Sequence, residues 1–433
     1  MLRLQVERRT RAALPAHHIP ANTGWIGSLL SWKTPDPNVA GTSSFRNPWP
    51  SFHKPSPKEV WDALAWGEDE DPCIQLAASA APSDVDSGSS PQARAQQAAS
   101  LLRIQKPDFS FDSSSSTVKS TWLGHAGILL QLPALRRGGN AINLLFDPIF
   151  SNRCSPSQVV GPVRSYLPPC KIEDLPPIDA VLLSHNHYDH LDYDTIMALW
   201  KNNTDRIRFF VPLNNLQWFL DCGIPKPRVT ELDWWDSAYL SDSELKTRHL
   251  KFTCTPAQHG SGRDGADASA SLWASWHLET TLPDDRLYRI FFAGDTGYQF
   301  HANPGDYPPC PAFTEITTKL GRPHLVFLPV ALGATWAYFR SFFHNYLPTS
   351  ADPFPRHSAD ADNDKKQEPM VAVAMHWGTF ITDPAEVLKT LGQLQWACEQ
   401  QQVHFARDLE GDSGEEGGVP KFIALNHGQS IST

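Results

Sequence analysis

The chain has 433 residues, of which 41% are hydrophobic, and it contains 22 Phe and 15 Trp. A chain of this length and composition can bury a sizeable core, as one large domain or two ordinary ones. The formal net charge of -10 argues against non-specific nucleic-acid binding through charge alone. No apolar run approaches the ~18 residues that a membrane-spanning helix needs.

The seven cysteines are scattered, and no pair of them is spaced as C-x-x-C. This pattern is typical of reduced thiols, not of a disulfide framework or a zinc ribbon, and it favours an intracellular protein. The first residues, MLRLQVERRTRAAL, are basic but lack the unbroken apolar stretch of a cleaved secretory signal. They leave a mitochondrial transit peptide open, although Glu7 counts against it, and the simpler interpretation is a solvated tail.

Residues 1–117 are expected to form an extended N-terminal segment that ends in a low-complexity linker. The stretch 77–100 is rich in Ala, Ser and Pro, and we predict that it is disordered. Charged segments near 356–369 and 408–418 are predicted to be disordered insertions. The remaining chain, 118–433, is expected to be one folded domain.

Short apolar runs in this domain end in polar or glycine-containing turns, a pattern typical of buried strands. These runs lie at 127–132, 142–147, 179–184, 207–212, 250–256, 289–295, 325–330 and 371–376. Helices are predicted at 192–201 and 382–402, the second with Asp383 as its N-cap and Pro384 in its first turn. Strands interleaved with helices predict a layered α/β domain.

The segment VLLSHNHYDHLD places His185, His187, Asp189 and His190 directly after a predicted strand. Imidazole and carboxylate together are the ligand set of zinc and similar transition ions, not of calcium or magnesium. Four candidate ligands in six residues exceed what one ion usually draws from a local segment. Their alternation indicates that two of them serve one ion and the next two serve a second.

Three other predicted strands each end with one further candidate ligand, namely His259, Asp295 and His376. Taken alone, a single histidine at the end of a strand is usually just a polar residue of a loop. Their recurrence at strand ends predicts a shared metal site. Asp295 is suited to bridge two ions because a carboxylate has two oxygens.

The histidine motif resembles the signature of the metallo-β-lactamase superfamily, whose fold is a four-layer αββα sandwich. The order and spacing of further segments resemble the branch of phospholipases D that hydrolyse N-acylphosphatidylethanolamine, at 121–132, 145–170, 231–236, 292–298 and 375–380. The resemblance covers nearly all of 118–404. It implies a dizinc hydrolase that releases N-acylethanolamine and phosphatidic acid through a metal-bridging hydroxide.

Carried over position by position, the resemblance implies two sets of zinc ligands. His185, His187 and His259 would hold the first zinc. Asp189, His190 and His376 would hold the second, with Asp295 bridging. Asp189 and Asp295 would also orient the proton of the nucleophile.

Two further residues would contact the substrate according to the resemblance. Tyr188 matches a residue that touches the phospholipid, although packing in the loop is the alternative. His344 matches a lipid-contacting histidine only loosely, because PVALGATWAYFRSFFHNYL departs from the family pattern. This departure leaves the lipid selectivity open.

Asp147 and Asp192 are candidates to orient the metal-bound imidazoles, and otherwise are turn or cap residues. The resemblance places His125 near the site, but it is not expected to be a ligand.

Other functions stay open at this point. A hydrolase of the same superfamily acting on a lactone, a thioester or another phosphodiester would share all seven ligands. A non-catalytic protein stabilised by zinc is disfavoured because the ligand set contains no cysteine. The aromatic stretches 43–52 and 336–343 either line an entrance for phospholipid at a peripheral membrane surface or pack in the core. The metal identity and a homodimeric state are not determined.

Overall fold

The computed structural model describes residues 2–11, 13–20, 42–52, 85, 90–242, 249–298, 308–330, 370–381, 383–409 and 421–433. A nine-stranded sheet runs in the order β1 (Leu2–Glu7), β10 (Ser237–Asp242), β11 (His249–Thr255), β12 (Ser275–Thr281), β13 (Leu287–Phe292), β14 (Leu325–Pro329), β15 (Val371–Met375), β17 (Lys421–Ile423) and β16 (His404–Ala406). A seven-stranded sheet runs in the order β18 (Ser430–Ser432), β4 (Lys119–Gly124), β5 (Gly127–Leu132), β6 (Ile142–Phe146), β7 (Ala180–Leu182), β8 (Arg208–Pro212) and β9 (Val229–Leu232). β2 (His18–Pro20) and β3 (Thr42–Phe45) form a small ribbon.

The two large sheets pack face to face, and alternate residues of their strands point to opposite sides. In β6, Leu144 and Phe146 belong to the core between the sheets, whereas Leu145 belongs to the core on the outer face. The rings of Phe146 and Phe292 stack across the two sheets with 4.6 Å between their centroids. Burial on both faces explains why these strands are continuous apolar runs in the sequence.

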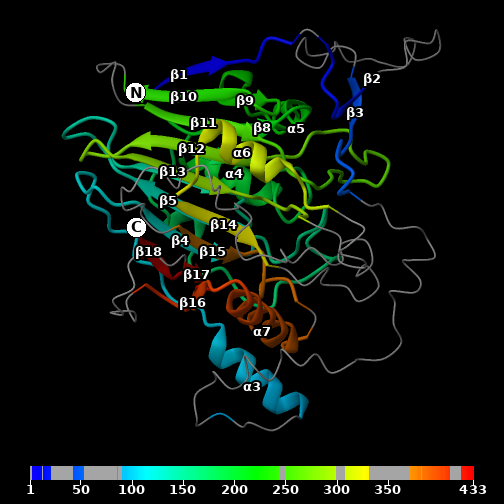
Figure 1. Ribbon diagram of the computed structural model, residues 1–433, viewed down its shortest axis with the longest axis vertical. Helices are drawn as coiled ribbons and strands as arrows, with labels where there is room; N and C mark the ends of the chain where they lie inside the picture. The colour runs from blue at the N-terminus through cyan, green and yellow to red at the C-terminus, as the bar shows by residue number, and fades with distance from the viewer. Residues whose placement is uncertain are drawn as a thin grey trace.

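Helices cover the outer faces of both sheets (Figure 1). On the seven-stranded sheet, Ile196 of α4 (Tyr193–Asn202) and Phe219 of α5 (Leu216–Asp221) pack against Val181 and Phe209. On the nine-stranded sheet, Phe313 of α6 (Ala312–Leu320) contacts the ring of Phe291, and α7 (Ala385–Gln400) buries a row of apolar side chains. The short 3-10 helices are η2 (Ile172–Asp174) and η3 (Lys226–Arg228). The predicted four-layer αββα sandwich is therefore confirmed.

The predicted strands and helices differ from the observed ones mainly at their ends. All eight predicted strands are present, and the first of them, β5, has the predicted bounds. The helix α7 begins at Ala385, later than the predicted residue 382, because Pro384 takes the cap position. The prediction of Asp383 as the N-cap is therefore wrong, although its Oδ1 accepts a hydrogen bond from the Ala385 N–H at 2.8 Å.

The expectation of disorder over 77–100 is wrong for its last ten residues. The helix α3 (Pro91–Leu101) begins after Ser90, whose side chain accepts a hydrogen bond from the Ala93 N–H at 3.1 Å. Ala93 and Ala98 are buried, and α3 contacts α7. A run of Ala and Gln that is low in complexity is also a good helix former. The residues 77–84 and 86–89, the predicted insertion 356–369, and 410–418 of the second insertion lie outside the described residues.

Part of the predicted N-terminal extension joins the nine-stranded sheet. β1 pairs antiparallel with β10, with Leu4 opposite Leu240. The domain boundary at residue 118 stays a prediction, although the first strand of the extension lies in the same sheet as the rest.

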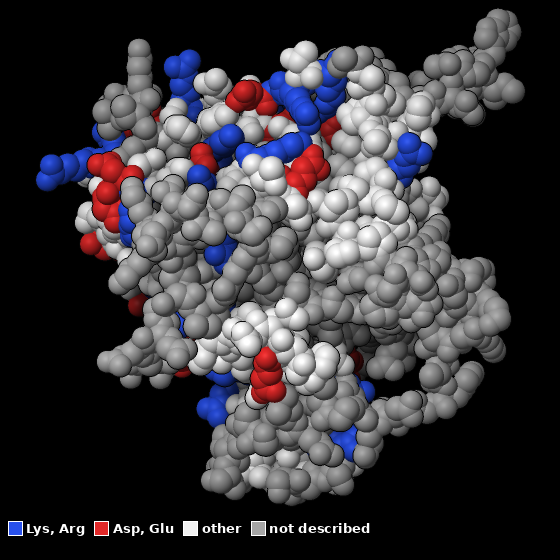
Figure 2. All heavy atoms as spheres, in the orientation of Figure 1, with Lys and Arg blue, Asp and Glu red and all other residues white. Residues whose placement is uncertain are grey.

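None of the described helices is long and apolar enough to cross a lipid bilayer. On the face drawn in Figure 2, described basic and acidic side chains are interspersed, so the net negative charge is not gathered there in one patch.

Candidate metal centre

The candidate ligands come together from the ends of strands in both sheets. His185 follows β7 of the seven-stranded sheet. His259, Asp295 and His376 follow β11, β13 and β15 of the nine-stranded sheet. Residues that are far apart in the sequence thus meet where their strands end, and all seven side chains predicted as metal ligands lie in this region.

Three histidines form the first donor group. The His185 Nε2 lies 2.8 Å from the His187 Nδ1, and the His259 Nε2 lies 3.3 Å from the same Nδ1. Burial lowers the pKa of each of these histidines, and that of His259 falls to about 3. Neutral imidazoles carry a lone pair, so three nitrogens that converge without a carboxylate between them fit a transition-metal ion.

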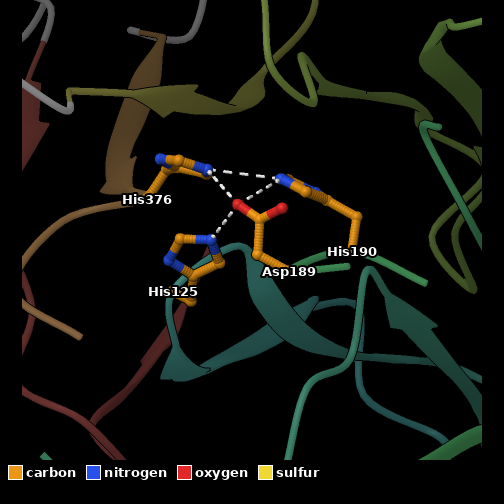
Figure 3. Close-up of side chains that lie close together, drawn as sticks. All are labelled: His125, Asp189, His190 and His376. Atoms are coloured by element: carbon orange, nitrogen blue, oxygen red, sulfur yellow. Dashed lines mark hydrogen bonds and ion pairs between the residues drawn. The ribbon is translucent and has the colours of Figure 1, made fainter. Parts of the chain in front are cut away.

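Asp189, His190 and His376 form the second donor group, and His125 lies against it (Figure 3). The Asp189 Oδ2 lies 3.4 Å from the His376 Nε2 and 3.5 Å from the His190 Nε2. The two histidine Nε2 atoms are 3.3 Å apart. One ligand atom from each of these residues therefore faces a common point.

Asp295 reaches both donor groups. Its Oδ2 lies 3.3 Å from the His190 Nε2 and 3.1 Å from the His376 Nε2 in the second group. The same oxygen lies 3.7 Å from the His259 Nε2 in the first group. Its Oδ1 is buried and has no hydrogen-bond partner among the described residues. A buried carboxylate oxygen without a partner, placed between two sets of imidazoles, fits a ligand shared by two ions.

The second group is electrostatically suited to positive charge. Burial alone would lower the pKa of His376, but the carboxylates of Asp295 and Asp189 raise it to about 9. The same carboxylates hold the pKa of His190 well above its usual value. Burial would raise the pKa of Asp189 and Asp295, yet the charge of His190 holds both well below their usual value. The donor set therefore fits a resident cation.

Asp147 orients one histidine of each group. Its Oδ2 lies 2.7 Å from the His190 Nδ1, and its Oδ1 accepts from the Ser184 N–H at 2.7 Å. The Ser184 hydroxyl donates to Asp147 and lies 2.8 Å from the His185 Nδ1. Such contacts fix the ring orientation and tautomer of a ligating histidine, as predicted for Asp147.

Asp192, the other residue considered for this role, contacts no histidine of the site in the hydrogen bonds of the described chain. Its carboxylate accepts from the Ser151 hydroxyl at 2.8 Å and from the Thr195 hydroxyl at 2.5 Å. Asp192 stands at the N-cap of α4. It therefore ties this helix to the loop after β6 from the N-cap position, which was its alternative, while its side chain accepts no capping hydrogen bond from the helix main chain.

His125 has a larger part in the site than the sequence indicated. Its Nε2 lies 2.9 Å from the Asp189 Oδ2, and its carbonyl accepts from the His376 N–H at 2.8 Å. Its own N–H donates to the Thr379 Oγ1 at 2.6 Å. The GHAG turn between β4 and β5 was the available signal, because it places a histidine at a strand end, but nothing local to the turn indicates contact with Asp189.

The two predicted substrate contacts have different outcomes. Tyr188 is half-buried in the motif, and the guanidinium carbon of Arg263 lies 3.9 Å from the centroid of its ring. Packing therefore accounts for part of its role, and contact with substrate stays a prediction. His344 lies outside the described residues.

An αββα sandwich with histidines and aspartates clustered at its strand ends is the arrangement of a superfamily whose members are generally metal-dependent hydrolases. The family model of the beta-lactamase superfamily domain matches residues 142–341. An uncharacterised protein of Mycobacterium tuberculosis is 33% identical over 318 residues, which are 73% of each chain. The chain belongs to the metallo-β-lactamase superfamily.

Two named relatives are similar to this chain over a shorter length. The N-acyl-phosphatidylethanolamine-hydrolyzing phospholipase D 1 of Caenorhabditis elegans is 31% identical over 271 residues, which are 62% of this chain and 65% of that protein. The probable L-ascorbate-6-phosphate lactonase UlaG of Escherichia coli is 26% identical over 216 residues, 48% of this chain and 52% of that protein. The chain thus spans less than two thirds of either relative.

Proposed function

We propose that this chain is a dizinc phosphodiesterase of the phospholipase D type, which hydrolyses N-acylphosphatidylethanolamine to N-acylethanolamine and phosphatidic acid. The observation that carries the two-ion part is the position of Asp295, whose Oδ2 reaches both donor groups. The substrate part is supported by the similarity to the C. elegans phospholipase.

The residues present fit two zinc ions. His185, His187 and His259 would hold one ion. Asp189, His190 and His376 would hold the other. Asp295 would be a ligand of both. When bound, zinc supplies Lewis-acid chemistry, because it polarises phosphoryl oxygens and lowers the pKa of water toward ~7.

The protein's own side chains would handle the proton. Asp189 has a side chain that is 26% exposed, the highest exposed fraction among the carboxylates and histidines of the ion pairs in this centre. His125 holds its Oδ2, while its other oxygen makes none of the contacts drawn in Figure 3. That oxygen could accept a hydrogen bond from the attacking water and so orient it toward phosphorus. Tyr188 and His344 are proposed to contact the lipid.

The test compares the wild type with Asp295→Asn for zinc content and for turnover of a defined N-acylphosphatidylethanolamine. We expect about two zinc ions per wild-type chain, and ethanolamide release reduced by a factor of at least 100 in the variant. Asp284→Asn is the matched control, since this aspartate pairs with Arg286 in an exposed turn. Two zinc ions without ethanolamide release would contradict the substrate, and a wild type that binds no metal would contradict the mechanism.

A lactonase is the second candidate, and the similarity to the E. coli lactonase is the observation that favours it. The same donor groups would serve it, so the ligands do not separate the two functions. Hydrolysis of a phosphorylated sugar lactone by the wild type, with no turnover of the phospholipid, would decide for the lactonase.

A phospholipid substrate implies contact with a membrane surface, which we propose for this protein. The aromatic stretch 43–52 does not line an entrance throughout, because Phe45 is buried and the ring of Trp49 stacks on Trp234 at 5.3 Å. The stretch 336–343 lies outside the described residues. A mitochondrial location stays the alternative that the sequence leaves open, and a homodimer stays a prediction.

A further inference from the structure

The main chain around His259 lies in a long connection that runs from residue 256 to 274, between β11 and β12. No helix or strand is assigned to this connection. The position of the His259 imidazole therefore depends on hydrogen bonds from other parts of the chain. This matters because His259 supplies the third nitrogen of the first donor group.

Asn47 binds both main-chain groups of His259. Its Nδ2 donates to the His259 carbonyl at 2.7 Å, and its Oδ1 accepts from the His259 N–H at 3.2 Å. The primary amide thus pairs with the peptide groups of His259 as a neighbouring strand would. The two residues are 212 positions apart in the sequence.

The same segment also holds the residue before His259. The Ser51 hydroxyl donates to the Gln258 Oε1 at 2.5 Å. The Gln258 main chain is bound to the residues that follow Asp295, because its N–H donates to the Thr296 Oγ1 at 2.9 Å and its carbonyl accepts from the Gly297 N–H at 2.8 Å. The connection carrying His259 is therefore bound to one N-terminal segment, residues 42–52, which we call the arm. The loop carrying Asp295 is joined to the same connection through Gln258.

The arm is itself fixed on the domain by a buried cluster. The His17 Nε2 lies 2.8 Å from the Asp233 Oδ1, and the His18 Nε2 lies 2.8 Å from the Asp233 Oδ2. Arg11 forms an ion pair with the same carboxylate at 2.7 Å, so a protein cation already occupies the place beside it. The other ring nitrogen of His18 lies 2.7 Å from the Thr42 hydroxyl at the start of the arm. This cluster is a tether for the arm.

We propose that Asn47 is a positioning residue of the metal centre, which holds His259 in the geometry that the first ion requires. The inference rests on the proposed function in one respect, namely that His259 ligates a metal. The N-terminal arm then completes the centre, although it is distant in sequence from every candidate ligand. Loss of the two hydrogen bonds would leave both main-chain groups of His259 without their partner and would weaken binding of the first ion selectively.

The experiment uses the full chain loaded with zinc and measures zinc per chain and the rate of zinc release to a chromogenic chelator. Asn47→Ala removes both hydrogen bonds, and we expect one of the two ions to be released at least tenfold faster than from the wild type. Asn47→Asp keeps the size and the acceptor but loses the donor to the His259 carbonyl. It should show the same defect, and it covers the case in which the alanine variant does not fold.

Arg46→Ala is the matched control, because its exposed side chain donates to the Ala16 carbonyl and does not touch His259. It should release both ions at wild-type rates. The visible spectrum after cobalt substitution gives a second measurement, and the band of one ion should change in the Asn47 variants alone. Wild-type release rates and an unchanged spectrum in both Asn47 variants would overturn the inference while leaving the proposed function intact. If the Asn47 variants released metal faster but the wild type did not hydrolyse the phospholipid, the inference would be supported and the proposed function contradicted.

Discussion

Three residues of the candidate centre have a main chain in the left-handed region, which residues other than glycine seldom adopt. The φ angles are 51° for His125, 37° for Asp147 and 62° for His376. Each of the three makes a hydrogen bond or ion pair within the centre. Such strain persists where surrounding contacts determine the conformation, and it is concentrated at functional sites. The local backbone thus gives support for the site that does not depend on the identity of the ligands.

Asp147 allows a sharp test at the scale of one residue. In Asp147→Asn, the amide keeps the size of the side chain, but one of its two acceptors is replaced by a donor that faces the His190 Nδ1. The ring of His190 then loses the partner that sets its tautomer. We expect metal affinity or activity to fall ~10–100-fold, measured by competition with a chelator and by substrate turnover.

Asp192→Asn is the matched control for this variant. Its carboxylate accepts hydrogen bonds from Ser151 and Thr195 and touches no candidate ligand in the described hydrogen bonds. Its substitution should weaken the hydrogen bonds from Ser151 and Thr195 and lower the free energy of unfolding by about 1 kcal/mol, the usual net contribution of one hydrogen bond. Equal loss of metal affinity in both variants would contradict the orienting role of Asp147.

At this scale the sequence predicted those residues that stand in a motif or directly after a strand. His185, His187 and His190 could be recognised because they share one short segment. Asn47 could not, since its role depends on a contact with a peptide 212 residues away. An asparagine also carries no chemical signature of a metal site.

Among the elements, the connection between β11 and β12 supports the histidine motif as well as carrying His259. The Arg263 Nη1 donates to the carbonyls of Asn186 at 2.7 Å and Leu191 at 2.9 Å. The Gly262 N–H donates to the side chain of Asn186 at 2.8 Å. The two ends of the motif are thus held by one guanidinium, which also packs over the ring of Tyr188.

Arg263→Ala should therefore destabilise the motif as a unit. Two partly buried carbonyls lose a charged donor, so the free energy of unfolding should fall by about 2 kcal/mol and zinc release should become faster. Arg263→Lys should recover only part of the loss, because an ammonium group lacks the planar fork. Chemical denaturation of the zinc-loaded and zinc-free proteins measures both effects.

Arg286→Ala serves as the control, since Arg286 lies in an exposed hairpin and pairs with Asp284 there. An exposed ion pair contributes ~0–1 kcal/mol, so this variant should change neither quantity by much. If Arg263→Ala behaved in the same way, Arg263 would have no bracing role.

Elements were predictable where their periodicity reflects burial. Strands such as β5 and β6 are buried on both faces, and each appears as a continuous apolar run, as INLLF does in β6. α3 was missed because its mean composition resembles that of a linker, and its helical state depends on packing against α7. A helix that is stabilised by tertiary contact leaves a weak periodic signal.

On the scale of the whole molecule, the centre exists because two sheets present their strand ends to one another. The seven-stranded sheet supplies the histidine motif, and the nine-stranded sheet supplies His259, Asp295 and His376. The sequence predicted strands that end in ligands, but it did not predict the order of the strands. Pairing between β13, β14 and β15 brings Asp295 and His376 to the same edge.

An exposed apolar loop lies beside this edge, and we propose it as the part of the described chain that meets a membrane. Val159, Val160 and Leu167 are exposed to 81%, 71% and 64%. Arg164 of the same loop is buried, and its guanidinium lies 5.5 Å from the ring of Phe380. The Phe380 ring in turn lies 5.1 Å from that of His125. The tip of the loop is thus apolar while its base reaches the metal centre.

We therefore expect the double variant Val159→Asp, Val160→Asp to bind vesicles of anionic phospholipid at least tenfold more weakly than the wild type. Full burial of one valine stabilises by roughly 1.5 kcal/mol, so partial burial of two accounts for such a factor. Co-flotation with vesicles measures binding. Turnover of substrate in vesicles should fall in parallel, whereas turnover of a dispersed short-chain substrate should not.

Leu287→Asp is the control, because Leu287 is also exposed but lies at the start of β13, at the end opposite Asp295. Equal flotation of both variants and the wild type would exclude this loop as the membrane contact and leave the chemistry of the centre untouched.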